Sequence, residues 1–240
     1  MFKHHGEKRT LSHNLQIASL LSFVAGLVNV AGFLAVQQLT TNVTGHFAFF
    51  ADEMVKLNFS AAFIYFLYIW FFFIGAFISS FLVEYSLINN ENNIYTIPII
   101  IEILILFIIV IFGPIWIIEH SNLVACSLLF TMGLQNSLVT KISDATVRTT
   151  HLTGLFTDLA IELSQIFFYK QPASKIKLYQ SIKLRLTIIS FFFTGGIIGG
   201  IFYTQMKLYV LLIAVLVLTG GLVYDYFKLK ILVLKRKHYK

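Results

Sequence analysis

The segment TTNVTG at Thr40–Gly45 returns as TTHLTG at Thr149–Gly154, 109 residues further along the chain. These two segments, here named the first and second Thr-Gly phrase, share four of their six letters, and each follows a long apolar run. Matching phrases at a fixed offset are the sequence sign of a repeated structural unit. We therefore predict that the chain is an internal duplication.

Further matches extend the duplication on both sides of the phrases. Upstream, Gly26–Asn29 (GLVN) corresponds to Gly133–Asn136 (GLQN), and downstream Phe71–Ala76 (FFFIGA) corresponds to Phe191–Gly196 (FFFTGG). The downstream offset is 120, which places the extra residues of the second copy near its basic loop. Each copy is predicted to contain an apolar helix, a Thr-Gly segment and two more apolar helices.

The composition places these helices in a bilayer. With 58% hydrophobic and 12% charged residues and a mean hydropathy of +0.81, the chain has too little polar surface for a soluble globule. A helix needs about 20 apolar residues to cross the hydrocarbon core. The stretches that qualify are about 15–36, 61–85, 95–118, 122–140, 183–203 and 207–227. We predict an all-α, polytopic transmembrane bundle of two tandem repeats, with six strong transmembrane helices and two Thr-Gly helices.

Lys and Arg residues gather at the N-terminus, around 169–185 and in the tail. The positive-inside rule places all three groups, and so both termini, in the cytoplasm. Topology and anionic lipid headgroups then explain the net charge of +7 without a nucleic-acid partner. The first apolar run is too long for a signal peptide and is predicted to be retained. The predicted units are a basic N-terminus at 1–14, repeats at 15–118 and 119–228, and a basic tail at 229–240.

The Thr-Gly segments decide how the copies are related. The stretches 40–59 and 149–168 are long enough for helices of about 30 Å, but both contain acidic residues. If they cross the membrane, each copy has four crossings and the copies are parallel; if they are re-entrant or lie on the surface, each has three and the copies are inverted. Counts of Lys and Arg fit both arrangements. The loop at 86–94 has neither residue, which favours the four-plus-four parallel arrangement, where this loop lies outside.

Each Thr-Gly phrase leads into a predicted helix with one polar face. The residues that share this face are Asn42, His46 and Glu53 in the first copy and His151, Asp158 and Glu162 in the second. An approximate twofold axis would bring the two faces together at the centre of the bundle. Carboxylates near lipid cost about 2.5–3.5 kcal/mol each, so they should face protein or water. They indicate a pathway for a proton, a cation or a small solute, unless they lie near an interface or join helices.

The phrases themselves support two interpretations. Thr can cap a helix start and Gly permits close approach, so a helix that begins inside the membrane would present its positive end to a solute. Close helix packing alone would use the same residues. The full set of candidates for a solute or proton pathway is Asn42, Thr44, Gly45, His46, Glu53, Gln135, Asn136, Thr150, His151, Thr153, Gly154, Asp158 and Glu162.

Small residues and amides inside the apolar runs favour helix packing. Amides such as Asn29, Gln135 and Asn136 can bind a solute but more often join two helices. Small residues four apart allow membrane helices to approach closely. The glycines assigned to packing are Gly26, Gly75, Gly133, Gly195 and Gly199.

Signatures of metal sites and enzymes are absent from the sequence. Cys126 is the single cysteine, and two histidines without a third suitable ligand are a weak metal signal. No Walker loop, dinucleotide-binding glycine pattern, His-Glu-x-x-His or Gly-x-Ser-x-Gly motif occurs. We predict no metal and no cofactor, and an enzyme is the least favoured class.

The motifs resemble a known family. Phe23–Phe33, Asn42–Gly45, Met132–Asn136 and Arg148–Gly154 look like the YoaK family, also called DUF1275. The resemblance covers most of the chain and both copies. It implies a bacterial, multi-pass inner-membrane protein of uncharacterised activity.

The chain departs from the family pattern in its first copy. The family commonly has Asn and Asp where this chain has His46 and Asn29, so any solute contact inferred there is in doubt. The second phrase, with its preceding Arg148, fits closely. If one copy preserves a site, we expect it to be the second.

The favoured function is a transporter or permease for a small solute, with or without proton coupling, whose site lies between the two Thr-Gly helices. Internal repeats, intramembrane acids and the lack of an ATP-binding motif favour this class. The alternatives are a membrane assembly or interaction protein and a membrane-embedded enzyme. The expected partners are the lipid bilayer and an unknown small solute, and oligomerisation is left open.

Overall fold

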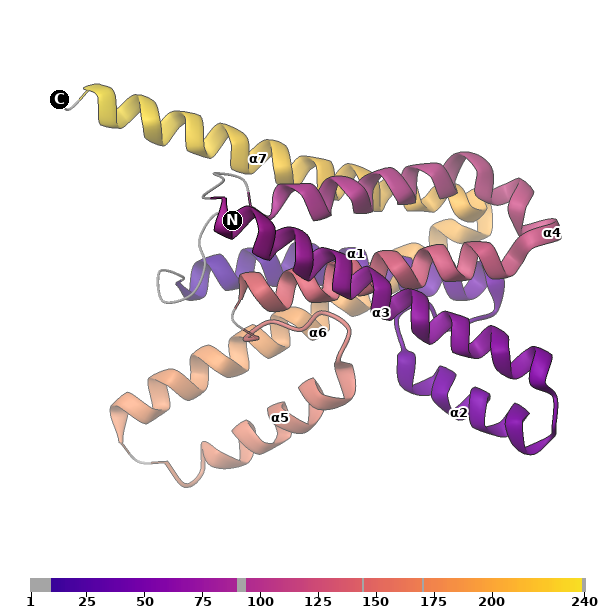
Figure 1. Cartoon of the computed structure of the whole chain (residues 1–240). Coiled ribbons are helices and arrows are strands. Elements are labelled where there is room, and N and C mark those ends of the chain that lie inside the picture. The colour runs from indigo at the N-terminus through magenta and orange to yellow at the C-terminus, as the bar shows by residue number, and fades with distance from the viewer. Residues whose placement is uncertain (1–9, 90–93, 144, 170, 239–240) are drawn as a thin grey trace.

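The computed structural model describes residues 10–89, 94–143, 145–169 and 171–238, with side chains omitted at 229 and 231–238 (Figure 1). Every regular element within these ranges is helical. The elements are α1 (Leu11–Val36), α2 (Val43–Val55), α3 (Phe59–Ile88), α4 (Thr96–Ile142), α5 (Leu152–Gln165), α6 (Pro172–Met206), the 3₁₀ turn η2 (Lys207–Val210) and α7 (Leu211–His238). The prediction of an all-α membrane protein is confirmed at this level.

Four helical stretches are long and apolar enough to cross a membrane. These are Leu11–Val36, Phe59–Ile88, Thr96–Ile142 and Pro172–Lys228. All six apolar runs predicted from the sequence fall inside them, because the last two stretches each contain two runs.

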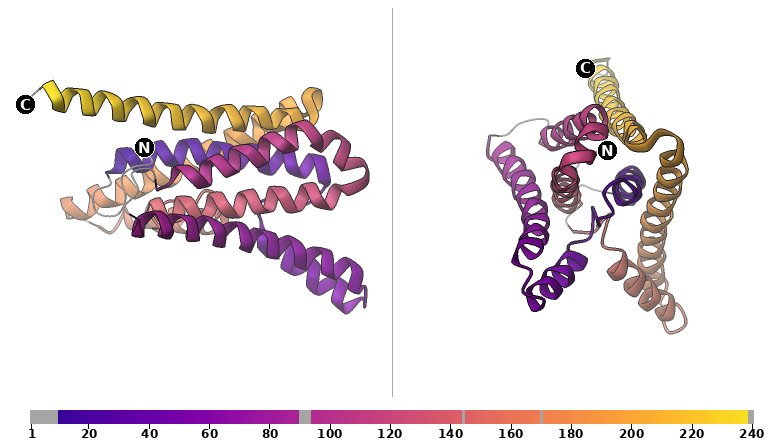
Figure 2. Two further views of the ribbon diagram at one scale, coloured as in Figure 1. Left: turned by 45° about the horizontal axis from the view of Figure 1, so that its top comes forward. Right: turned by 90° about the vertical axis from the view of Figure 1, so that its right-hand side faces the viewer.

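The two longest stretches are each interrupted where the chain turns back. His120 in α4 has a non-helical backbone (φ −134°, ψ 46°) and divides the helix into a first arm, 96–119, and a second arm, 121–142. Lys207 ends α6 at φ 49°, ψ −135°, and η2 leads into α7. In both cases the chain reverses, so the arms of α4 run antiparallel, as do α6 and α7 (Figures 1 and 2).

The predicted twenty-residue Thr-Gly helices are not formed. α2 has 13 residues and α5 has 14, which corresponds to about 20 Å at 1.5 Å per residue. Both begin inside their phrase, near the middle of the molecule, and run toward opposite ends of it (Figure 1). Full crossing by these segments, which the four-plus-four arrangement requires, is therefore not supported by their length.

Helices that carry matching sequence segments run in opposite directions. α1 and the second arm of α4 carry the matching GLVN and GLQN segments, and they are antiparallel (Figures 1 and 2). α3 and α6, which carry the matching FFFIGA and FFFTGG segments, are antiparallel too.

The α1–α6 crossing is close enough for backbone contact at glycine. A Cβ added at Gly26 would lie 1.9 Å from the Phe192 carbonyl oxygen, and one at Gly195 would lie 2.0 Å from the Phe23 carbonyl oxygen. At Gly199 the distance to the Leu27 carbonyl oxygen would be 3.0 Å. Any larger side chain at the first two positions would push the helices apart.

The crossing of α3 with the second arm of α4 repeats this geometry. A Cβ at Gly133 would lie 2.0 Å from the Phe72 carbonyl oxygen, and one at Gly75 would lie 2.0 Å from the Phe130 carbonyl oxygen. Gly26 and Gly133 correspond in sequence, and so do Gly75 and Gly195. The two crossings therefore use glycines that correspond in the matching sequence segments.

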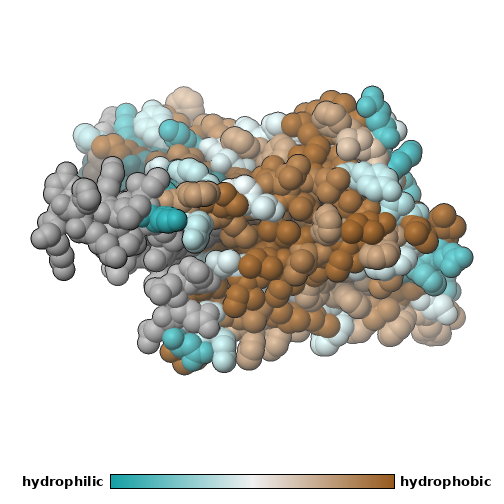
Figure 3. All heavy atoms as spheres, turned by 90° about the horizontal axis from the view of Figure 1, so that it is seen from above, coloured by the Kyte–Doolittle hydropathy of each residue, from teal (hydrophilic) through white to brown (hydrophobic). Residues whose placement is uncertain are grey.

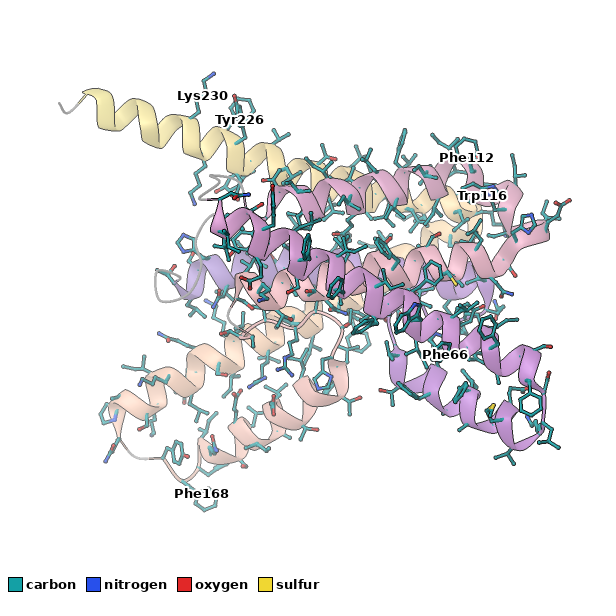
Figure 4. The ribbon with its side chains drawn as sticks, viewed as in Figure 1. Phe66, Phe112, Trp116, Phe168, Tyr226 and Lys230 are labelled. Carbon is teal, nitrogen blue, oxygen red and sulfur yellow. The ribbon has the colours of Figure 1, made fainter. Side chains whose placement is uncertain are left out.

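The face seen in Figure 3 is apolar across its middle, and hydrophilic residues gather at its right-hand end. On α3, the exposed side chains Phe66, Trp70, Phe73, Phe77 and Phe81 stack in sequence, with ring centroids 5.3 to 6.4 Å apart. On the first arm of α4, the exposed Phe112 stacks on the half-buried Trp116 (Figure 4). So much exposed aromatic surface requires an apolar solvent, as expected of an integral membrane protein.

Candidate functional site

Arg185 of α6 pairs with both acidic residues on the polar face of α5. Its Nη1 lies 2.9 Å from Asp158 Oδ2, and its Nε donates to Glu162 Oε2 at 2.9 Å. Ser181 Oγ donates to the other carboxylate oxygen, Glu162 Oε1, at 2.5 Å. The Glu162 side chain is only 13% exposed, whereas that of Asp158 is 50% exposed. Glu162 is thus a fixed partner of Arg185, while Asp158 keeps one side open to solvent.

A cavity of about 410 Å³ opens beside this cluster, and we call it the α5–α6 cavity. Its walls come from the loop before α5, from the first two turns of α5 and from α6. The lining residues are Ala145, Thr146, Arg148, His151, Gly154, Leu155, Asp158, Ser181, Leu184 and Arg185. Two guanidinium groups, a carboxylate, an imidazole and two hydroxyl groups therefore share one space, whose lining is more polar than apolar.

The start of α5 also shapes the cavity. His151 occupies the cap position but makes no side-chain cap hydrogen bond. Its ring lies over Gly154, where an added Cβ would come within 2.2 Å of His151 Nε2. Glycine at this position therefore makes room for the imidazole at the cavity wall. Because the His151 side chain does not cap the helix, it leaves the first N–H groups of α5, the positive end of the helix dipole, without a side-chain cap.

The surroundings of the first Thr-Gly phrase have different chemistry. His46 is fully buried, and its Nε2 lies 2.6 Å from the Leu39 carbonyl oxygen. Its ring contacts Phe49, Tyr65 and Tyr68 at centroid distances of 6.5, 6.1 and 5.0 Å. By the offsets of the repeat, Phe49 and Tyr65 correspond to Asp158 and Arg185. An aromatic contact, 5.2 Å between the Phe49 and Tyr65 centroids, thus stands where the second copy has its ion pair.

Asn42 and Glu53 form hydrogen bonds at the start and the end of α2. Asn42 Oδ1 accepts a hydrogen bond from the Gly45 amide and so caps the helix start. Glu53 accepts from Asn58 Nδ2 at 2.7 Å, and Lys56 Nζ lies 3.5 Å from it. Both contacts belong to the turn between α2 and α3.

The predicted meeting of Glu53 and Glu162 does not occur. α2 and α5 diverge from the middle of the molecule, so Glu53 lies toward one end and Glu162 toward the other (Figure 1). In the second copy, by contrast, His151 and Asp158 line the α5–α6 cavity and Glu162 joins it through Arg185.

Hydrogen bonds hold both Thr-Gly phrases to the neighbouring long helix. Thr41 Oγ1 donates to Asn29 Oδ1 at 2.7 Å in the first copy, and Asn136 Nδ2 donates to Thr150 Oγ1 at 2.6 Å in the second. Thr149 Oγ1 also donates to Asn136 Oδ1, at 3.2 Å. These equivalent bonds fix the point at which each short helix begins.

The other predicted residues have mixed positions. Gln135 is buried and donates through Nε2 to the Leu21 carbonyl oxygen at 3.0 Å, which joins α4 to α1. Thr44 and Thr153 are exposed, and neither is among the residues that line the α5–α6 cavity. Asn136 lines a second, more open cavity of about 480 Å³, which shares Ala145 with the α5–α6 cavity.

Two further residues are not among those predicted from the sequence. The sequence indicates Arg185 only as part of a basic cytoplasmic loop, and the fold shows that it faces α5. Glu102 is fully buried in the first arm of α4, and neither of its carboxyl oxygens has a hydrogen-bond partner. A single acidic residue in the otherwise apolar stretch 97–118 is a visible signal, but an average over the whole stretch conceals it.

Among the described residues, no group of three or more His, Cys, Asp and Glu side chains is placed to hold a metal ion. Cys126 is buried as a free thiol.

Comparisons with known proteins give one match. The model of a family described as "Protein of unknown function (DUF1275)" matches residues 17–224, most of the chain. No curated protein and no solved structure matches. The matched range includes both Thr-Gly phrases, both glycine crossings and the α5–α6 cavity. The chain belongs to the DUF1275 family.

Proposed function

We propose that the protein is a secondary transporter or permease for a small polar solute, built from two inverted halves. Each half contributes three membrane crossings and one re-entrant half-helix, α2 or α5. The antiparallel directions of matched helices and the short lengths of α2 and α5 support this arrangement. Inverted repeats with discontinuous helices at the membrane midplane are a common transporter architecture.

This arrangement also gives a strong charge asymmetry. Of the 18 Lys and Arg residues, only Lys56 and Lys207 fall on the side opposite the termini. The positive-inside rule then favours the cytoplasmic side for both termini. The resemblance to the family implies that the membrane is a bacterial inner membrane. The Lys141–Glu84 ion pair is consistent with this topology, because it joins the ends of α4 and α3 on the same side.

The α5–α6 cavity is the observation that carries the proposal. Its volume of about 410 Å³ lies within the range of small-molecule sites. Its lining is mainly polar, which suits a polar solute. Arg148 and Arg185 suit an anionic group, and the open side of Asp158 suits a cationic one. The cavity begins beside the second Thr-Gly phrase, where α5 starts near the middle of the molecule (Figure 1).

Transport can be tested with purified protein in proteoliposomes. We would record uptake, or currents on a solid-supported membrane, for glycine, lactate, inorganic phosphate and choline, which cover zwitterionic, anionic and cationic solutes. Arg185→Gln should abolish the response to the transported solute. Lys177→Gln removes one positive charge from the exposed surface of the same helix, away from the cavity, and should leave the response intact. Equal responses from Arg185→Gln and wild type would exclude the cavity as the site.

A further inference from the structure

The first arm of α4 carries a carboxyl group in the interior of the bundle. Glu102 is 0% exposed, and its neighbours on the same helix face, Ile99 and Leu106, are 0% exposed as well. Glu102 lies six residues after the helix start at Thr96, a rise of about 9 Å. The first arm starts at the end of the molecule toward which α5 runs (Figure 1).

Among the residues that the structure describes, no group compensates a charge on Glu102. Both carboxyl oxygens are buried and without a hydrogen-bond partner. The elements that pack against α4 are α1, α3, α7 and η2. Their described acidic and basic side chains are His13, Glu84, Lys207, Asp225, Lys228 and Lys230. None of these forms a hydrogen bond with Glu102.

The contrast with Glu162 shows what this environment implies. The Glu162 carboxylate has Arg185 and Ser181 as partners, so its negative charge is matched. An isolated carboxylate in an apolar interior is so costly that the group takes up a proton and becomes neutral. Ionisable residues of this kind in membrane proteins mark proton or ion pathways.

We propose that Glu102 is a proton-binding site inside the membrane, which holds an exchangeable proton in the resting state and supplies the coupling proton of transport. The binding of the proton follows from the burial of Glu102 and its lack of partners. Only the coupling role rests on the transport function proposed above.

Infrared spectroscopy tests this directly. Spectra of wild type and Glu102→Gln in lipid nanodiscs at neutral pH should differ by the loss of a protonated carboxylic acid band, which lies above the amide I region. In D₂O this band should shift to lower frequency in the wild type, because an exchangeable proton is replaced by deuterium. Glu162→Gln is the matched control, and it should remove a carboxylate signal instead.

Two outcomes would overturn the proposal. If Glu102→Gln removes a carboxylate signal, Glu102 is charged and holds no proton. If the acid band does not shift in D₂O, the proton is sealed in and cannot couple to transport. Neither outcome depends on a transported solute, so failure here is distinguishable from failure of the uptake assay.

A second measurement covers the case in which Glu102→Gln does not fold. A lipid-soluble carbodiimide adds to protonated carboxyl groups in apolar regions, and peptide mass spectrometry locates the adduct. Wild-type protein should carry it on the peptide that contains Glu102. Labelling of other acidic residues with none at Glu102 would contradict the proposal.

Discussion

Arg185 is the residue on which the α5–α6 contact depends. Arg185→Gln leaves Glu162, 13% exposed, without its cationic partner. A buried polar group that loses its partner costs about 1–3 kcal/mol, and a charged group costs more. We expect a lower midpoint of thermal unfolding in detergent. Adding Glu162→Gln to this variant should recover part of the loss, because the uncompensated charge is then gone. If Glu162→Gln changes the midpoint of thermal unfolding equally in the wild type and in the Arg185→Gln variant, the two residues are not coupled.

Asn136 fixes the start of α5 through two hydroxyl groups, those of Thr149 and Thr150. Hydrogen bonds between membrane helices are worth about 0.6 kcal/mol each on average, so Asn136→Ala should destabilise the protein by about 1 kcal/mol. Thr187→Ala is the control, since Thr187 Oγ1 bonds only the Lys183 carbonyl of its own helix. Thermal unfolding of the two variants side by side gives the difference. An equal loss of thermal stability in the two variants would mean that the hydrogen bonds of Asn136 do not hold the second Thr-Gly phrase in place.

Helix crossings supply the next test, because they depend on glycine at particular positions. Gly133→Ala places a methyl group 2.0 Å from the Phe72 carbonyl oxygen, so α3 and α4 must separate, at a cost of about 1–3 kcal/mol. Gly220→Ala meets nothing within 4 Å and should stabilise α7 by up to about 1 kcal/mol, since Ala favours helix over Gly. Opposite shifts in thermal stability are expected. If Gly220→Ala instead lowers the thermal stability, Gly220 packs against a neighbour that the single chain does not contain.

Helix positions were largely predictable from the sequence, and helix lengths at the phrases were not. Long apolar runs fix the spans because hydrocarbon admits only helices with apolar surfaces. The reversal at His120 falls between the predicted runs 95–118 and 122–140, where apolar character is interrupted. α2, in contrast, ends at Val55, and nothing in the apolar pattern marks that end. Its capping residue Lys56 and the turn at Leu57, with φ 59°, become evident only in the structure.

Only the part of the candidate site that lies on α5 was predictable from the sequence. Helical periodicity predicts that Asp158 and Glu162 share a face, since that inference needs only local geometry, and in the structure both pair with Arg185. His151, at the cap position before α5, lines the same cavity as Asp158. Arg185 lies 23 residues beyond Glu162, and a tertiary contact of this kind leaves no trace in a single sequence.

At the scale of the whole molecule, the two arrangements differ in which side of the membrane each turn occupies. Charge counts alone are ambiguous because few Lys or Arg residues lie in the turns that change sides. The 86–94 loop contains no Lys or Arg, so the only argument for placing it outside is that it lacks positive charge. The direction of matched helices supplies the stronger argument, because a parallel duplication cannot place α1 and the second arm of α4 antiparallel (Figure 2).

Single cysteines at three turns test this arrangement, in a Cys126→Ala background that removes the buried native thiol. With the termini inside, the inverted arrangement places Lys56 and Glu119 outside and Asn89 inside. The parallel arrangement predicts the reverse at all three positions. Lys56 and Glu119 are both well exposed, with side chains 56% and 80% accessible, so a membrane-impermeant maleimide should label both in intact cells. Asn89→Cys should react only after permeabilisation. Labelling of Asn89→Cys from outside, with Lys56→Cys protected, would establish the parallel arrangement and remove the re-entrant role proposed for α2 and α5.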